Sequence, residues 1–308
     1  CSPVHNPDDE GWSEYIAPFT IDNESCHRIE YYSVDELGNK EPVRAQCVFV
    51  DNTPPALWKI HSEGMIKDYD EELGEFHWMT KDMQTDLYCK DEGAHPVNHV
   101  KLWYRVWDDI SQNWSEWIDP CGVEAHKTIT FNEDSVHKIQ YYCEDILGNS
   151  NGTRDEPHEQ VYKVDSTPPN TTKTYLGPHY VDENGIEYID TATTIELTAE
   201  DGEDICAVGV KKIYYRVTLI GDAYCYGTLD CNNASGEGSF TEYINPFNIS
   251  EESCHLIEYY SIDSLGNTET IKRQCVFVDK TPPVIEKSYG EPYFSENGAE
   301  WITSSTPI

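Results

Sequence analysis

A repeat of 114 residues constrains this chain more than any other feature of its sequence. The string V-D-x-T-P-P occurs three times, starting at Val50, Val164 and Val278, and both intervals are 114 residues. A second shared block lies upstream of each string, as CHRIEYYSVDELGN, VHKIQYYCEDILGN and CHLIEYYSIDSLGN. Repetition at one fixed spacing predicts a tandem array of similar domains.

The repeat divides the 308 residues into four parts. We expect the C-terminal part of one domain at 1–55, complete domains at 56–169 and 170–283, and the opening strands of a further domain at 284–308. These parts are called repeats one to four below. The chain is therefore expected to be a window from a longer array.

Each repeat has the pattern of a β-sandwich. The runs 46–50, 101–107 and 212–218 are short, rich in β-branched and aromatic residues, and bounded by Gly, Asn, Asp or Pro. Leu-Gly-Asn at 37–39 lies between two such runs and predicts a hairpin turn. The double proline after each linker Thr ends the last strand. About seven strands in about 110 residues fit a sandwich.

Repeat two resembles the immunoglobulin (Ig) fold. Four of its residues match the strand-B cysteine, the strand-C tryptophan that packs on the bridge, the tyrosine corner and the strand-F cysteine, in this order: Cys89, Trp103, Tyr141 and Cys143. The resemblance implies tandem Ig-like antiparallel β-sandwich domains in an all-β fold, with a Cys89–Cys143 disulfide. Repeat three has Ala199 and Ser261 at the cysteine positions, so the bridge is optional.

The wider resemblance is to the tandem Ig-like repeats of large bacterial adhesins and archaeal surface proteins, which close on a G-N turn and a V-D-x-T-P-P linker. It covers the whole chain and implies a non-catalytic component of a cell-surface stalk, S-layer or filament. The alternative is an adhesin whose domains bind glycans or a partner cell surface. Trp107, Trp114 and Trp117 could stack on sugar rings. Trp12, Trp114 and Trp117 recur with the repeat, however, as does Tyr243, which favours a framework role.

Composition and motifs exclude several classes of function. The chain has 57 acidic and 21 basic residues, a formal charge of −36, which disfavours binding to nucleic acid or anionic lipid. It has no apolar stretch of about 18 residues that could span a membrane. It has no H-E-x-x-H, G-x-S-x-G or phosphate-binding glycine loop, so we expect no enzyme. The expected partners are neighbouring repeats, copies of the chain and other surface proteins.

The acidic residues predict calcium sites at the linkers. In a tandem array, each linker meets the B–C and F–G turns of the next sandwich. This would gather two sets of acidic residues: Asp51 with Asp91, Glu92 and Asp145, and Asp165 with Asp201, Glu203, Asp204 and Asp263. Carboxylate oxygens are ligands that calcium prefers. In the alternative, the aspartates of the D-x-x-G-N turns, Asp35, Asp145 and Asp263, only accept backbone hydrogen bonds.

Eleven cysteines predict an oxidising compartment outside the cell. Two pairs are each 21 residues apart, and repeat two has valine at both equivalent positions, so the paired loss predicts two bridges: Cys26–Cys47 and Cys254–Cys275. A further bridge is expected between Cys225 and Cys231, or between Cys206 and Cys231. We expect Cys1 to pair outside the window and Cys121 to be free or intermolecular.

Six N-x-S/T sequons predict glycosylation. They begin at Asn23, Asn113, Asn151, Asn170, Asn233 and Asn248. We expect Asn151 and Asn170 to be the most accessible, because one lies beside a turn and the other beside a linker.

Overall fold

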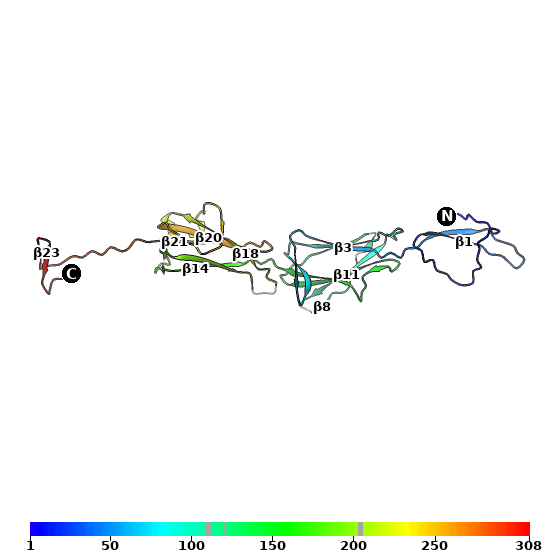
Figure 1. Ribbon diagram of the computed structural model, residues 1–308, viewed down its shortest axis with the longest axis horizontal. Helices are drawn as coiled ribbons and strands as arrows, with labels where there is room; N and C mark the ends of the chain where they lie inside the picture. Colours follow the sequence, from blue (N-terminus) through cyan, green and yellow to red (C-terminus); the bar gives the residue numbers. More distant parts are fainter. Residues whose placement is uncertain (109–111, 120, 123, 203–205) are drawn as a thin grey trace. The chain divides into compact units, whose positions relative to one another are not determined.

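The computed structural model of the protein (Figure 1) describes all residues except 109–111, 120, 123 and 203–205. Strands make up 45% of the chain and helices 2%, which confirms the predicted all-β class. None of the helices in this described part is long and apolar enough to cross a membrane. The predicted domain boundaries remain predictions.

Contacts divide the chain into two compact units, each described here by itself. Unit 1 comprises Cys1–Asn170, Glu200–Lys211 and Ser261–Glu269. Unit 2 comprises Thr171–Ala199, Lys212–Tyr260 and Thr270–Ile308. Two loops of repeat three therefore belong to the same unit as repeat two.

Repeats one and two supply most of unit 1. Repeat one contributes an antiparallel hairpin of β1 (Cys26–Tyr31) and β2 (Arg44–Phe49). Repeat two forms a three-stranded sheet, in the order β10 (Glu124–Ile129), β6 (Thr85–Lys90) and β3 (Ala56–His61). Its larger sheet has the order β4 (Ile66–Asp70), β5 (Gly74–Met79), β13 (His158–Val164), β11 (Val136–Asp145), β7 (Val100–Asp108) and β8 (Asn113–Trp114). Two short strands flank it, β9 (Cys121–Gly122) on β7 and β12 (Ser150–Asn151) on β11.

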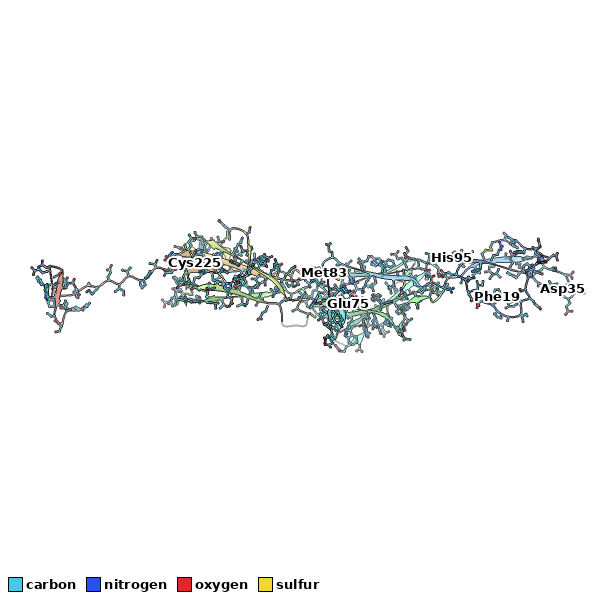
Figure 2. The ribbon with its side chains drawn as sticks, viewed as in Figure 1. Phe19, Asp35, Glu75, Met83, His95 and Cys225 are labelled. Atoms are coloured by element: carbon cyan, nitrogen blue, oxygen red, sulfur yellow. A yellow bond between two sulfur atoms is a disulfide. The ribbon has the colours of Figure 1, made fainter. Side chains whose placement is uncertain are left out.

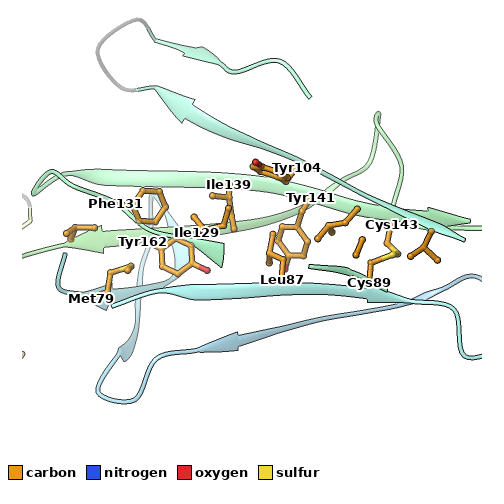
Figure 3. Close-up of a cluster of buried hydrophobic side chains, with 14 residues drawn as sticks. Met79, Leu87, Cys89, Tyr104, Ile129, Phe131, Ile139, Tyr141, Cys143 and Tyr162 are labelled. Carbon is orange, nitrogen blue, oxygen red and sulfur yellow. A yellow bond between two sulfur atoms is a disulfide. The ribbon is translucent and has the colours of Figure 1, made fainter. Parts of the chain in front are cut away.

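The core of repeat two lies between these sheets (Figure 3). Alternate residues of β6 face inward, so Leu87 and Cys89 are fully buried, opposite residues of the larger sheet such as Ile139. Burying a side chain of that size contributes about 1.5–3 kcal/mol. Cys89 is bonded to Cys143, as the resemblance implied.

The prediction that Trp103 packs on the Cys89–Cys143 bridge is wrong. Cys143 faces the core from β11, and the residue opposite it on β7 is Leu102, which is fully buried. Trp103 is one position further and so lies on the other face of the sheet. There it stacks on Tyr142, with ring centroids 6.0 Å apart, and its Nε1 donates to Glu144 at 3.0 Å.

Repeat three supplies most of unit 2. Its smaller sheet pairs β14 (Asn170–Leu176) with β17 (Thr194–Glu200). Its larger sheet has the order β15 (His179–Val181), β16 (Glu187–Ile189), β21 (Lys272–Val278), β20 (Ser253–Asp263), β18 (Val210–Leu219) and β19 (Thr241–Glu242). Helix α1 (Asp222–Cys225) and a 3-10 turn (Cys231–Asn233) follow β18, and repeat four forms the hairpin β22 (Tyr293–Glu296) and β23 (Ala299–Ile302).

Three predicted disulfide pairings are wrong. The bonds are Cys1–Cys47, Cys225–Cys254 and Cys231–Cys275, in place of Cys26–Cys47, Cys254–Cys275 and Cys225–Cys231. The strand register explains the error, because Cys275 lies opposite Leu256 rather than Cys254, and Cys47 lies opposite Arg28 rather than Cys26. Cysteines offset by two residues have Cβ atoms about 7–8 Å apart, whereas a disulfide needs about 3.5–4.5 Å.

Each strand cysteine of repeat three instead bonds to the segment that contains α1 and the 3-10 turn. Repeat two lacks both strand cysteines because it also lacks the two cysteines of the equivalent segment, to which they would bond. Cys1 has a partner within the chain, contrary to expectation. The Cys206–Cys231 alternative is also wrong, and Cys206 is buried against Phe76, Trp78 and Val161. The side chain of Cys121 lies outside the described residues.

Four inward-facing polar side chains join the two sheets of repeat two. Lys59 on β3 donates to Gln160 on β13, and the amide nitrogen of Gln160 lies 3.2 Å from Nδ1 of His77 on β5. His77 stacks on His61 of β3, with ring centroids 4.4 Å apart. Burial, followed by the charges of His77 and Lys59, lowers the pKa of His61 to about 4. Burial also lowers the pKa of His77.

Replacing Cys89 and Cys143 together by alanine should lower the free energy of unfolding of repeat two by about 4 kcal/mol. The bridge spans 54 residues, and the chain-entropy model gives a value of that size for such a loop. Repeat three has a sandwich without this bridge, so the variant should still fold. Urea denaturation of the oxidised protein measures the change, and an unchanged midpoint would contradict it.

Acid should destabilise repeat two through His61. Its folded pKa is about 4, below the value of about 6.5 in an unfolded chain, so its contribution is complete above about pH 6.5 and is lost as the pH falls toward 4. The variant His61→Tyr, which copies Tyr175 at the equivalent position of repeat three, should lose less stability between pH 7 and 5 than the natural protein. Urea midpoints at both pH values measure this, and equal losses in the two proteins would refute it.

Candidate metal site

The D-x-x-G-N turns of repeats one, two and three share a hydrogen bond from the asparagine N–H to Oδ1 of the aspartate. Oδ1 of Asp145, the last residue of β11, accepts hydrogen bonds from the N–H groups of Leu147 at 2.8 Å and Asn149 at 3.0 Å. Gly148 has φ of +94°, a conformation that favours glycine. Asp35 accepts the equivalent bonds from Leu37 and Asn39, whereas Asp263 accepts from the N–H groups of Gly266 and Asn267. The turn role proposed as the alternative for these aspartates is therefore present.

The asparagine that ends this turn also joins it to the linker. Nδ2 of Asn149 donates to Oδ2 of Asp145 at 2.7 Å and to the backbone oxygen of Asp51 at 3.1 Å. Asn267 forms the matching bonds, to Asp263 at 2.6 Å and to the backbone oxygen of Asp165 at 3.0 Å. The sequence predicts only a turn role for these asparagines, although the constant spacing from Asp to Asn could have indicated their bond to the linker.

Two clusters of three buried aspartates lie where linkers meet these turns. In each cluster, one carboxylate oxygen from each residue lies within 4.8 Å of the other two, and both clusters lie within unit 1. Their members are the six residues predicted as ligands, Asp51, Asp91 and Asp145 in the first and Asp165, Asp201 and Asp263 in the second. All six side chains are at most 9% exposed. Calcium binding by these clusters remains a prediction.

Of the other acidic residues named with these six, Glu92 is not part of a cluster. Glu92 is exposed and forms an ion pair with Lys90, with an N–O distance of 3.2 Å. Glu203 and Asp204 lie outside the described residues.

Burial and like charge both act on the second cluster. Burial raises the pKa of Asp165, and the carboxylates of Asp201 and Asp263 raise it further. Burial likewise raises the pKa of Asp201, with a contribution from Asp263. A bound cation would relieve both effects, because it supplies positive charge where water is excluded.

The first cluster contains a carboxylate oxygen that needs a partner. Oδ1 of Asp51 accepts from the N–H of Thr53 at 3.1 Å, but Oδ2 is buried and has no hydrogen-bond partner among the described residues. A buried charged oxygen in that state costs free energy unless a donor or cation reaches it. The donor set consists only of oxygen atoms, which fits a hard cation such as calcium.

A cavity of about 560 Å³ adjoins the first cluster. It is lined by Phe49, Asp51, Ala94, His95, Pro96, Val97 and Leu147. His95, labelled in Figure 2, packs against Phe49 with the rings tilted by 32° and their centroids 5.2 Å apart. Asp51 therefore forms part of the wall of this cavity.

The tryptophans considered for sugar stacking pack against Arg105 or against another tryptophan. The guanidinium of Arg105 lies 4.9 Å from the ring centre of Trp114 and 4.6 Å from that of Trp117. Trp107 contacts Trp114 edge-on at 5.5 Å. All three tryptophans are half-buried, so this packing supports the framework role.

Five of the six sequon asparagines are exposed: Asn23, Asn113, Asn170, Asn233 and Asn248. The expected accessibility of Asn151 is wrong. It is half-buried on β12, where its Nδ2 donates to the backbone oxygen of Pro55 at 3.3 Å and its Oδ1 lies 3.0 Å from His158. Glycosylation at the other five positions remains a prediction.

No family model matches this chain, and no curated protein matches its sequence. Among solved structures, the fibronectin(III)-like modules of Clostridium thermocellum CbhA are 13% identical, with a TM-score of 0.27, over 69% of this chain and 94% of theirs. The FN1–FN3 domains of chicken CNTN1 are 9% identical, with a TM-score of 0.27, over 82% of this chain and 78% of theirs. TM-scores this low do not establish a shared fold, so the assignment of an all-β fold is based on the strands described above.

Replacing Asn149 by alanine should lower the stability of unit 1 by about 1–3 kcal/mol, because the buried backbone oxygen of Asp51 loses its donor. The matched control is Asn39→Ala. Asn39 forms the same turn bond, to Asp35 at 2.8 Å, but is exposed and donates to no linker oxygen among the described residues. Thermal unfolding compares the two variants, and equal losses would show that the linker bond contributes nothing.

Proposed function

We propose that this chain is a non-catalytic structural segment of an extracellular cell-surface protein, a stalk, S-layer or filament, in which calcium ties each linker to the repeat that follows. The single observation that carries the proposal is the duplicated cluster. The same three aspartates, one from the linker and two from loops of the next repeat, are buried together twice. A structural element reproduced at successive linkers suits a protein whose role is to join domains in a fixed way.

Other features agree with this role. Four disulfides fit an oxidising environment outside the cell. The Pro-Pro pairs stiffen the linkers, because proline fixes its own φ and restricts the preceding residue. The partners we propose are neighbouring repeats together with copies of the chain or other surface proteins. The adhesin alternative gains no comparable support, because Arg105 covers the tryptophan rings best suited to bind sugar.

Calcium should raise the melting temperature of the protein at pH 7 relative to a chelator. The ion binds the folded clusters and not the unfolded chain, so it stabilises by mass action, by about 2.7 kcal/mol at one hundred times the dissociation constant. The double variant Asp51→Asn, Asp165→Asn should lose this response. In the absence of calcium, the double variant should melt at a temperature no lower than that of the natural protein, because the substitutions also remove repulsion between carboxylates.

Differential scanning calorimetry with calcium chloride and with EGTA makes the comparison. Magnesium chloride at equal ionic strength controls for general screening of the −36 charge. Equal melting temperatures in calcium and in EGTA would refute the proposal.

A further inference from the structure

We infer that the two clusters depend on calcium unequally: the first cluster (Asp51, Asp91, Asp145) needs the ion to become ordered, whereas protein contacts hold the second (Asp165, Asp201, Asp263). This inference rests on the proposed function and specifies where calcium regulates it. The chain provides an internal comparison, because corresponding residues surround both clusters.

The linker aspartates differ in their hydrogen bonds. In the second cluster, Oδ2 of Asp165 accepts from the N–H of Val208 at 2.8 Å, so the loop of repeat three holds the linker carboxylate directly. In the first cluster, the corresponding valine, Val97, donates instead to Oδ2 of Asp91 at 2.6 Å. Within the part of the chain that the structure describes, Oδ2 of Asp51 is left buried without a hydrogen-bond partner, and Asp51 is only 6% exposed.

A neighbouring acidic residue adds to this difference. The linker threonine donates to an acid in both places, Thr53 to Glu24 at 2.7 Å and Thr167 to Asp134 at 2.6 Å. Lys81 forms an ion pair with Asp134 at 3.2 Å. Among the described residues, no ion pair neutralises Glu24. Negative charge around the first cluster is therefore less compensated.

Apolar packing differs in the same direction. Beside the second cluster, Cys206, Val208 and Leu265 from the loops of repeat three pack on Phe76, Trp78 and Val161 of repeat two, all within unit 1. Beside the first cluster, Val97 and Leu147 line the 560 Å³ cavity with Phe49. Leu147 is 62% exposed and Phe49 is 64% exposed. Little apolar contact thus holds the first linker to its neighbouring loops.

A calcium ion at the first cluster supplies what these contacts do not. It provides Oδ2 of Asp51 with a positive partner, offsets the repulsion among Asp51, Asp91 and Asp145, and joins the linker to both loops through their carboxylates. At the second cluster, protein contacts already fill these roles. The N–H of Val208 bonds to Asp165, Lys81 pairs with Asp134, and apolar side chains pack beside the linker. Removing calcium should therefore loosen the first linker and leave the second in place.

Amide hydrogen exchange of the full chain, with calcium chloride or with EGTA at pH 7, tests this directly. The matched probes are the turn amides of residues 146–149 and of residues 264–267. Calcium should slow exchange about tenfold or more at 146–149, the change expected from one added interaction with a charged group. The change at 264–267 should stay below about threefold.

Two variants provide matched controls. Asp51→Asn should abolish the calcium effect at 146–149, and Asp165→Asn should leave it in place. Equal slowing at both turns, or slowing at 264–267 alone, would overturn this inference and leave the proposed function standing. No slowing at either turn would overturn both.

Discussion

The burial of three like-charged carboxylates at each of two linkers, those that contain Asp51 and Asp165, is the constraint on which the arrangement of unit 1 depends. Two such charges 4.8 Å apart repel by roughly 3–4 kcal/mol at an effective dielectric constant of about 20. A backbone N–H bonded to a charged group returns about 1.5–3 kcal/mol. Because a cluster contains three such pairs, the donors, ion pairs and apolar packing around it together decide whether it is held by the protein alone or needs a cation.

The repeat and its turns made this constraint predictable from sequence. The linker aspartate, the B–C loop and the D-x-x-G-N turn occur at nearly constant spacing, and an Ig-like sandwich brings both loops to one end. All six clustered aspartates could therefore be named from the sequence. The pairing of Cys89 with Cys143 followed from the resemblance in the same way, because it depends on fold and not on strand register.

Features that depend on register or on local donors could not be predicted. A two-residue offset between paired strands separates Cys254 from Cys275, and spacing along the sequence does not reveal it. The same holds for Trp103, because strand alternation places Leu102 in the core. Nor could the sequence indicate that Val208 donates to Asp165 while Val97 donates to Asp91, since that choice depends on loop geometry.

Native mass spectrometry of the full chain in calcium-containing buffer tests the central claim most directly, because it counts bound ions. The account predicts two calcium ions per chain at saturation, with one ion lost in Asp51→Asn and one lost in Asp165→Asn. A natural chain that carries no specifically bound calcium, or variants that bind as many ions as it does, would show that these clusters are not calcium sites.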